Sequence, residues 1–428
     1  MAEPEIHIEG GRIKGKVTPH ASKNTALPEL GAALLSNENV HISHIPDITD
    51  VNNLMQLITR LGGYAVRENG DGDFNGSGIE KTDIPEEFTK LRASYYVVPA
   101  LLAKQGEAGL YLPVGCEIGK RPIDFHIKGW KQMGVEVEEN DHIQLYVPNG
   151  LHGADINLEK SSVGATLTLM MTATQSDDET IIRNAAIEPE VIDTADLLIK
   201  MGADITYDPN KREITINGPT KLEGCKHRVP YDRIEIWTLM VAAAITHGRI
   251  TIENLFEQDI KDVQNIMDVL EQTGVTFEVG KDYIKVTGAD NIRPYKGTLV
   301  TAPHPGFPTD MQAILCAYLT QANGTSYIEE KVFEDRTAHA DGLNNMRADI
   351  TVSKLDFGHS FEIKCPTKLH GAKVTAPDLR GGAAYYLAAL CAEGETIIMG
   401  HNLVKRGYEN LEKTLFNLGA RKMNEWNV

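Results

Sequence analysis

Basic side chains stand at or beside five of six predicted helix starts in this chain. The backbone N–H groups at a helix N-terminus lack intrahelical partners and lie at the positive end of the helix dipole, so stable helices usually place acids there. Basic residues at the same places therefore predict an anionic ligand, and their repetition indicates one rich in phosphate. The six starts carry Lys23, Arg92, Lys160 with Ser162, Asp232 with Arg233, Asp310, and Arg380.

A cysteine in a glycine-containing segment is the second candidate for chemistry. Cys116 lies between Gly115 and Gly119, and Lys120 and Arg121 follow within five residues. Nearby cations lower the pKa of a thiol and favour the reactive thiolate. The alternative for an isolated cysteine is a small buried hydrophobe, and this is the interpretation we give to Cys225, Cys316, Cys365 and Cys391.

An acid at a further helix start is the third candidate. Three prolines between Thr301 and Asp310 stiffen the approach to a helix that Thr309 could cap, with Asp310 in the first turn. An acid in a first turn is also favourable to the helix dipole, so the residues alone leave Asp310 open as a purely structural group.

The elements that must position these residues form six copies of one unit. Each copy has a strand-like run, a helix rich in small residues, a short strand and a second, amphipathic helix. The second residues of the pairs that end the second helices are 68 to 73 residues apart. This period exceeds that of common solenoid repeats, so we expect six compact β/α subdomains, three in each of two domains, with a boundary near 228–231. The pairs are Leu61-Gly62, Met133-Gly134, Met201-Gly202, Thr273-Gly274, Met346-Arg347 and Leu418-Gly419. Periodicity does not say which copy a first strand at 5–18 joins.

Composition narrows the classes of protein. The 428 residues carry a net charge of −18, which argues against a partner that is a nucleic acid or an anionic membrane. The apolar runs fall short of the roughly 18 residues that cross a bilayer, and the N-terminus has no signal-peptide pattern. The odd number of cysteines without a C-x-x-C spacing predicts no disulfide framework or zinc site, and hence a reducing cytoplasm. A nucleotide P-loop, a G-x-G-x-x-G motif and a metal-ligand cluster are absent from the sequence, so we expect no cofactor and no metal.

Taken together, the motifs resemble those of the enolpyruvyl transferases over essentially the whole chain. The resemblance implies a two-domain inside-out α/β barrel of six repeated subdomains, with the active site in the interdomain cleft. It also implies that the N-terminal strand completes the C-terminal domain, which gives domains at 1–22 plus 230–428 and at 23–229. The matching segments are Ser22–Pro28, Arg92–Ser94, the Cys116 segment, Ser162–Thr166, Pro303–Gln312, Asp378–Arg380 and Arg406–Glu409.

The resemblance also implies a reaction in the cytoplasm. The enolpyruvyl group of phosphoenolpyruvate would pass to the 3′-hydroxyl of UDP-N-acetylglucosamine with release of phosphate, the first committed step of peptidoglycan synthesis. By the same resemblance, Cys116 would be an acid or form a covalent adduct, and fosfomycin would alkylate it. Asp310 would be the base, with Lys23 and Arg406 also catalytic.

The resemblance assigns the binding residues as well. Those for phosphoenolpyruvate would be Lys23, Asn24, Arg92, Arg121, Arg380 and Arg406. Those for the UDP-sugar would be Arg92, Arg121, Pro122, Ile123, Asp124, His126, Lys160, Ser162, Val163, Gly164, Asp310 and Val332.

Several residues depart from the pattern common in this family, and they leave the acceptor open. The departures include Ile187, Trp237, Thr337 and Lys405. One alternative is an enolpyruvyl transferase that acts on another uridine nucleotide, such as UMP. Another is a catalytically silent paralogue that binds UDP-sugar and regulates, although such a protein would need neither acid nor base. The shikimate-pathway relative lacks the cysteine segment. The sequence carries no indication of the oligomeric state.

Overall fold

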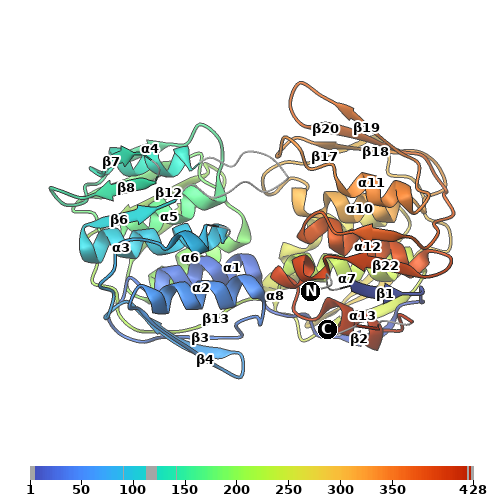
Figure 1. Cartoon of the computed structure of the whole chain (residues 1–428), viewed down its shortest axis with the longest axis horizontal. Helices are drawn as coiled ribbons and strands as arrows, with labels where there is room; N and C mark the ends of the chain where they lie inside the picture. The colour runs from blue at the N-terminus through green and yellow to red at the C-terminus, as the bar shows by residue number, and fades with distance from the viewer. Residues whose placement is uncertain (1–4, 90, 112–122, 141, 422–423, 426–428) are drawn as a thin grey trace. The chain divides into compact units, whose positions relative to one another are not determined.

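Two compact units make up the chain in the computed structural model, which describes residues 5–89, 91–111, 123–140, 142–421 and 424–425 (Figure 1). The N-terminal unit comprises the described residues between Ala21 and Pro230. The C-terminal unit comprises the described residues up to His20 together with those from Tyr231 onward. Within the described residues, the chain therefore passes from one unit to the other after His20 and again after Pro230.

The N-terminal unit combines helices with three sheets, whose strand orders are β13-β3-β5-β4, β6-β8-β7 and β11-β12-β10-β9. Its helices are α1 (Lys23–Ala33), α2 (Thr49–Arg60), α3 (Val98–Gln105), α4 (Asp124–Gln132), α5 (Val163–Ala173) and α6 (Pro189–Lys200), with 3₁₀ turns η1 (Glu86–Phe88) and η2 (Arg92–Val97). Its strands are β3 (Val40–Ser43), β4 (Tyr64–Glu68), β5 (Asp71–Asn75), β6 (Glu107–Leu110), β7 (Glu136–Glu139), β8 (Ile143–Tyr146), β9 (Asp155–Asn157), β10 (Glu179–Arg183), β11 (Asp204–Asp208), β12 (Glu213–Asn217) and β13 (Lys226–Arg228).

The C-terminal unit also combines helices with three sheets, whose strand orders are β15-β16-β14-β2, β17-β18-β20-β19 and β21-β22-β1-β23. Its helices are α7 (Arg233–Ile245), α8 (Glu257–Asp262), α9 (Gln264–Gln272), α10 (Gln312–Leu319), α11 (His339–Asn345), α12 (Leu379–Cys391) and α13 (Leu411–Asn417), with 3₁₀ turns η3 (Thr309–Met311) and η4 (His401–Arg406). Its strands are β1 (Glu5–Ile8), β2 (Lys14–Val17), β14 (Arg249–Glu253), β15 (Thr276–Val279), β16 (Tyr283–Thr287), β17 (Thr298–Val300), β18 (Ser326–Glu330), β19 (Ile350–Lys354), β20 (His359–Ile363), β21 (Lys373–Thr375), β22 (Thr396–Met399) and β23 (Asn424–Glu425). The predicted α/β class is therefore confirmed.

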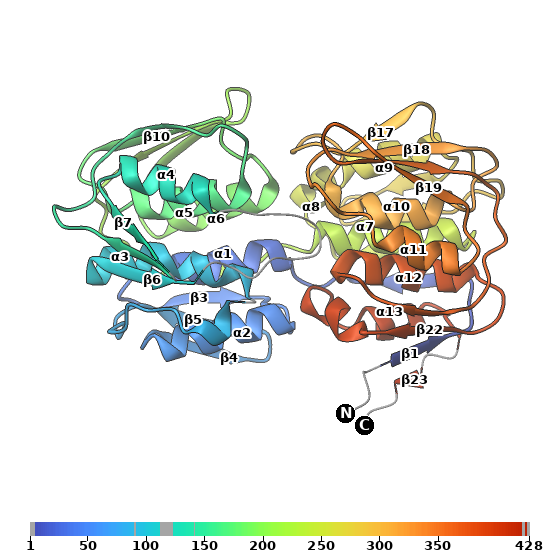
Figure 2. The ribbon, with the colours of Figure 1, turned by 45° about the horizontal axis from the view of Figure 1, so that its top comes forward.

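Buried helices form the centre of each unit. In the C-terminal unit α7, α10 and α12 pack on one another, and every residue from Gln312 to Leu319 of α10 is buried. In the N-terminal unit α3 packs on both α1 and α5. A helix that is apolar on all sides belongs in a core, and Figure 2 shows α1 and α5 between the sheet of β3 and the sheet of β10. The outer helices, such as α2 and α9, bury only one face.

The six predicted endings of the second helices are confirmed. Each helix stops just before its pair, and the second residue of each pair has a positive φ, as at Gly62 with 96° and Gly202 with 106°. Glycine takes this backbone conformation without a steric penalty. One copy departs from the pattern, because Arg347 adopts a φ of 68° there.

The expected single strand at 5–18 is wrong, because the segment forms two strands in two different sheets. Gly10 and Gly11, with φ of 81° and 147°, turn the chain between them. Strand β1 pairs antiparallel with β22, and β2 pairs parallel with β14. The N-terminal residues thus complete two sheets of the C-terminal unit.

Two of the predicted first helices begin differently from the expectation. The chain at Arg92 enters the 3₁₀ turn η2 before α3 starts at Val98, and the chain at Thr309 enters η3 before α10 starts at Gln312. The other four start at or next to the predicted residue, with Ser22, Ser162, Asp232 and Asp378 as N-caps that accept backbone N–H groups.

A buried polar chain anchors the middle of α1. Glu29 is fully buried, and its Oε1 lies 2.7 Å from His227 Nε2 on β13, while His227 Nδ1 lies 3.0 Å from Lys200 Nζ at the end of α6. A lysine ammonium only donates, so Nδ1 accepts and Nε2–H donates to Glu29. Burial raises the pKa of Glu29 well above its ordinary value, and the charge of Lys200 offsets only part of that effect.

Replacing Glu29 by glutamine should make thermal stability less sensitive to alkaline pH. An acid whose pKa is raised by folding stabilises the protein below its unfolded pKa, and this contribution is lost as the pH rises through the folded pKa. Glutamine has no such titration and can still accept the proton of His227. We expect the Tm of Glu29→Gln minus that of the parent to become more positive between pH 5 and pH 8.5, measured by circular dichroism. The exposed control Glu68→Gln should give a constant difference; a constant difference for Glu29→Gln too would contradict the interpretation.

Candidate active site

The starts of the three central helices carry the candidate residues of the C-terminal unit. Asp232 caps α7 by accepting the N–H groups of Ile234 and Glu235, and Asp378 caps α12 by accepting those of Arg380 and Gly381. Because α7, α10 and α12 pack on one another, side chains from different starts interact.

Asp310 lies between two buried arginines. Its Oδ1 is 3.2 Å from Arg336 Nη2 and 3.3 Å from Arg380 Nε. The Asp310 side chain is 32% exposed, whereas those of Arg336 and Arg380 are 5% and 3% exposed. The carboxylate therefore faces the outside of the unit, and the two guanidinium groups hold it from within.

Electrostatics keep Asp310 ionised. Burial alone would raise its pKa, but the charges of Arg380 and Arg336 outweigh burial and hold the pKa of Asp310 well below its ordinary value. A further contribution in the same direction comes from Arg233. Asp232 behaves in the opposite way, since burial raises its pKa to about 6 although Arg380 acts against it.

Arg380 has donor capacity beyond its bond to Asp310. Its guanidinium lies 5.1 Å from the centre of the Tyr408 ring, and the Tyr408 hydroxyl pairs with Thr238 Oγ1 at 2.8 Å. Within the described residues, Arg380 Nη1 is buried and has no hydrogen-bond partner. A buried guanidinium nitrogen without a protein acceptor is suited to an anionic ligand.

Arg336 is a site residue that the sequence analysis missed. It donates from Nη1 to Thr309 Oγ1 at 2.9 Å and from Nη2 to Asp310. It follows no helix start and belongs to no motif, so its only signal was its position shortly after Val332, in the segment that follows β18. Its partners lie 26 and 27 residues away along the chain.

The predicted cap by Thr309 is wrong. Its hydroxyl donates to Glu330 Oε2 at 2.6 Å instead, and η3 has no side-chain cap. Glu330 is fully buried and its Oε1 accepts the backbone N–H groups of Val332 and Phe333. The Thr309 hydroxyl is therefore bound to Glu330 and to Arg336 and does not cap η3. These two bonds hold the segment that carries Arg336. Asp310 does lie in the first turn, as predicted.

Four further predicted positions belong to the same unit. Trp237 is fully buried, donates from Nε1 to the Val263 carbonyl at 3.3 Å, and carries the guanidinium of Arg233 4.9 Å from its ring centre. Trp237 is therefore a core residue that supports a candidate cation. Arg406 is the last residue of η4, and its neighbour Lys405 lies 3.7 Å from Glu412. Thr337 follows Arg336 and is partly buried.

In the N-terminal unit, Lys23 is the first residue of α1 and forms an ion pair. Its Nζ lies 2.8 Å from Asp50 Oδ2, and the two side chains are 14% and 7% exposed. The next residue, Asn24, donates to Glu190 Oε1 at 3.4 Å. Arg92 is the first residue of η2 and is partly buried. The turn η2 packs on α1. Residues of α1, α2, α6 and η2 thus meet at one end of α1.

His126 is a neutral imidazole beside the start of α5. Burial lowers its pKa to about 3. Its Nδ1 lies 2.7 Å from Thr168 Oγ1, whose hydroxyl donates to the Gly164 carbonyl at 3.2 Å, so Nδ1 carries the hydrogen. A Cβ added to Gly164 would lie 3.2 Å from His126 Nε2, so a larger residue would crowd the imidazole.

Other UDP-sugar candidates of the N-terminal unit that the structure describes lie at or near the starts of α5 and α4. Ser162 caps α5 by accepting the Ala165 N–H at 3.4 Å, and Val163 is its first residue. Lys160 lies two residues before the cap and Ile187 is partly buried. Ile123 and Asp124 occupy the N-cap and first position of α4. Cys116, Arg121 and Pro122 lie outside the described residues.

Among the described residues, His, Cys, Asp and Glu side chains form no group of three or more that could hold a metal ion. The helices that the structure describes include none with the length and apolar character needed to cross a membrane.

The chain belongs to the EPSP synthase (3-phosphoshikimate 1-carboxyvinyltransferase) family, whose model matches residues 8–415. It is 42% identical to the UDP-N-acetylglucosamine 1-carboxyvinyltransferase of Halothermothrix orenii, covering 96% of this chain and 97% of that one. It is 40% identical to the UDP-N-acetylglucosamine 1-carboxyvinyltransferase of Enterobacter cloacae, covering 96% of each chain. The resemblance to enolpyruvyl transferases is thereby confirmed.

Solved structures share the fold. The enolpyruvyl transferase NikO from Streptomyces tendae matches with a TM-score of 0.88 at 23% identity, covering 99% of this chain and 100% of that one. EPSP synthase from Acinetobacter baumannii matches with a TM-score of 0.74 at 18% identity, with the same coverage of both chains. At these identities the likeness establishes a two-domain α/β fold and nothing finer.

Asp310→Asn should destabilise the protein at every pH between 5 and 8. A carboxyl whose pKa is lowered by folding contributes stability above its unfolded pKa, and this is lost only as the pH falls through the folded value. Removing the carboxylate takes away the ion-pair partner of Arg336 and one of the acids near Arg380, at a cost of about 3–5 kcal/mol. Thermal unfolding followed by calorimetry measures the effect. The exposed neighbour Asp335 provides the control, since Asp335→Asn should unfold like the parent; equal unfolding of Asp310→Asn would refute the ion-pair account.

Proposed function

We propose that this protein transfers the enolpyruvyl group of phosphoenolpyruvate to the 3′-hydroxyl of UDP-N-acetylglucosamine and releases phosphate. The name shared by relatives that are 40% identical or more supports this acceptor. The observation that carries the chemistry is Asp310, an ionised and partly exposed carboxylate held by Arg336 and by Arg380 at the start of α12.

The reaction makes three physical demands on a protein. The carboxylate and phosphate of phosphoenolpyruvate must be held still, C3 of the enol must receive a proton, and the acceptor hydroxyl must lose one. We assign the first demand to Arg380 and Arg406, together with Lys23, Asn24, Arg92 and Arg121. Arginine suits this role because its planar fork binds carboxylate and phosphate oxygens in pairs. The unpartnered Nη1 of Arg380 supports the assignment.

Asp310 is the proposed base. A carboxylate with a lowered pKa is a weak base toward a free alcohol. The hydroxyl becomes far more acidic as its oxygen bonds to the cationic carbon that protonation at C3 produces, so the proton can pass to Asp310 late in the reaction. Permanent ionisation by the two arginines keeps the base in the form that can accept it.

The diphosphate is assigned to the start of α5. The backbone N–H groups at a helix start, here those of Ser162, Val163 and Gly164, are suited to phosphate oxygens. His126 is neutral there and contributes no charge, so Lys160 and Arg121 would balance the diphosphate. Pro122, Ile123, Asp124, Val332 and Arg92 complete the proposed UDP-sugar site.

The proposal includes features that lie beyond the described geometry. Cys116 is assigned as the acid or adduct-forming thiol. The two-domain inside-out barrel of six subdomains, with domains at 1–22 plus 230–428 and at 23–229, is proposed from the resemblance. We also propose that the protein acts in peptidoglycan synthesis in the cytoplasm. It would need no metal or cofactor and bind no nucleic acid or membrane. The free thiols of Cys225, Cys316, Cys365 and Cys391 suit a reducing compartment.

Phosphate release from phosphoenolpyruvate should require UDP-N-acetylglucosamine. We expect turnover with this acceptor, and at least about tenfold lower kcat/KM with UMP or 3-phosphoshikimate, because their contacts to the α5 start are incomplete. A coupled phosphate assay on the purified protein measures all three. A preference for UMP would show that the acceptor is another uridine nucleotide. Absence of phosphate release with all three acceptors would leave only the alternative of a catalytically silent regulatory protein.

Fosfomycin should alkylate Cys116 and no other cysteine. Mass spectrometry after incubation with the drug should find one adduct in the parent and none in Cys116→Ala. Cys116→Asp should keep turnover and resist the drug, because a carboxylic acid can donate the same proton. Labelling at Cys225, a partly exposed thiol that serves as internal control, would refute the assignment. Loss of turnover in Cys116→Asp would mean that sulfur does more than donate a proton.

A further inference from the structure

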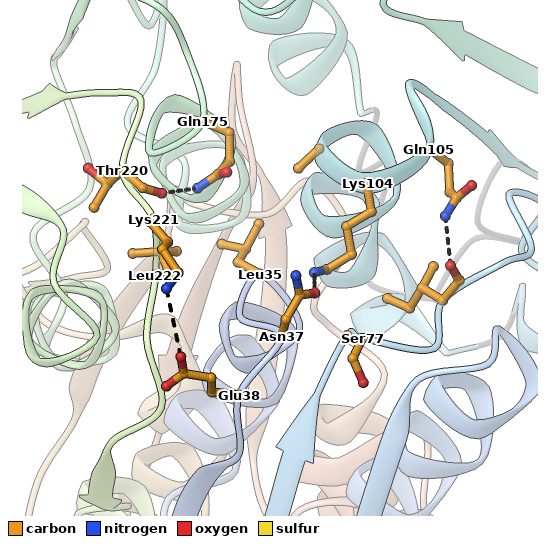
Figure 3. A pocket seen from close by; sticks show the side chains of 13 residues that line it. Leu35, Asn37, Glu38, Ser77, Lys104, Gln105, Gln175, Thr220, Lys221 and Leu222 are labelled. Atoms are coloured by element: carbon orange, nitrogen blue, oxygen red, sulfur yellow. Dashed lines mark hydrogen bonds and ion pairs between the residues drawn. The ribbon is translucent and has the colours of Figure 1, made fainter.

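A hollow of about 430 Å³ lies at the C-terminal ends of the helices whose starts carry the candidate site of the N-terminal unit. Leu35, Ile79 and Leu222 form apolar parts of its lining. Asn37, Ser77 and Lys104 are among its polar side chains (Figure 3). Its volume falls in the range of small-molecule pockets, which begins at about 300 Å³. The proposed reaction uses none of these residues.

Lys104 differs from the lysines on the surfaces of the two units. Many of those ammonium groups pair with carboxylates, as Lys16 does with Glu253 at 2.9 Å and Lys128 with Glu159 at 2.5 Å. Lys104 is half-buried in the last turn of α3, and its Nζ donates to the neutral Asn37 Oδ1 at 2.6 Å. In the part of the chain that the structure describes, no ion pair joins Lys104 to a carboxylate.

The environment of Lys104 favours the unprotonated amine. A carboxylate partner would stabilise the ammonium form, whereas an amide oxygen does so much less, and burial lowers the pKa of Lys104. The other charged side chains around the hollow are Glu38 and Lys221, which pair with each other at 3.9 Å and are 55% and 82% exposed. Glu38 and Lys221 offset each other, so with Lys104 unprotonated the lining carries no net negative charge that would repel an anionic reagent.

We propose that Lys104 is a site of acylation by small acyl phosphates that enter this hollow. The unprotonated Nζ attacks the carbonyl carbon, a C–N bond forms, and the C–O bond to phosphate breaks. Phosphate leaves with the electron pair of that bond, and the surplus proton on nitrogen passes to solvent. The product amide has lost the charge of Lys104 and keeps one N–H that can donate to Asn37.

Acetyl phosphate is the probe, and Lys221 on the same hollow is the internal comparison. The full-length protein is incubated with acetyl phosphate at pH 8, and the acetylation rate of each lysine is read by quantitative peptide mass spectrometry. We expect Lys104 to react at least about fivefold faster than Lys221, since each unit of pKa difference changes the unprotonated fraction up to tenfold. The ratio should fall as the pH approaches 10.5. A ratio of one or less at pH 8 would overturn the proposal.

Two substitutions at Asn37 test whether the acetylation rate of Lys104 depends on the charge beside its amine or only on how accessible the amine is. Asn37→Asp places a carboxylate beside Nζ and should slow Lys104 acetylation at least about threefold at pH 8, with Lys211, a distant exposed lysine, unchanged. The matched control Asn37→Ser adds no charge and should leave Lys104 fast. An unchanged rate in Asn37→Asp would overturn the proposal. If either variant misfolds by circular dichroism, the pH dependence of the parent decides, because equal pH profiles for Lys104 and Lys221 contradict it.

Discussion

The ion pairs of Asp310 with Arg336 and Arg380 are the interaction on which the candidate site depends. Two guanidinium groups that are almost completely buried need a counter-charge, and one partly exposed carboxylate supplies it to both. The arrangement fixes the ionisation of Asp310 and leaves Arg380 Nη1 available. It is possible only because η3 and α12 begin side by side, while the buried Glu330 anchors the segment that carries Arg336.

The buried helices of the N-terminal unit position functional side chains at both of their ends. Their starts hold Lys23, Arg92 and the Ser162 cap, and their ends surround the hollow that contains Lys104. The helices can be close-packed because Gly31 of α1 lies against the backbone of Tyr96, where an added Cβ would come within 2.5 Å of the carbonyl oxygen. Gly31 therefore permits the close approach of α1 and η2.

The net charge of −18 says little about the ligand. Much of the surface charge is paired within the protein, as in Lys285 with Glu278 and Lys368 with Glu393. Exposed charges also fade beyond a screening length of about 8 Å in physiological salt. Buried groups such as Arg380 and the Asp50 partner of Lys23 are screened much less, so the local arrangement of charge determines what an anion meets.

The sequence by itself determined the features that depend on neighbours along the chain. The six helix endings, the caps at Ser162 and Asp232 and the place of Asp310 in a first turn follow from rules that act within one turn of helix. The resemblance to the enolpyruvyl transferases rested on such local motifs. Only the tertiary structure decided the role of Arg336, the bond of Thr309 to Glu330 and the burial of Glu29 against His227. Those partners lie 21 to 198 residues apart, and packing of distant helices and strands brings them together and decides how their charges are compensated.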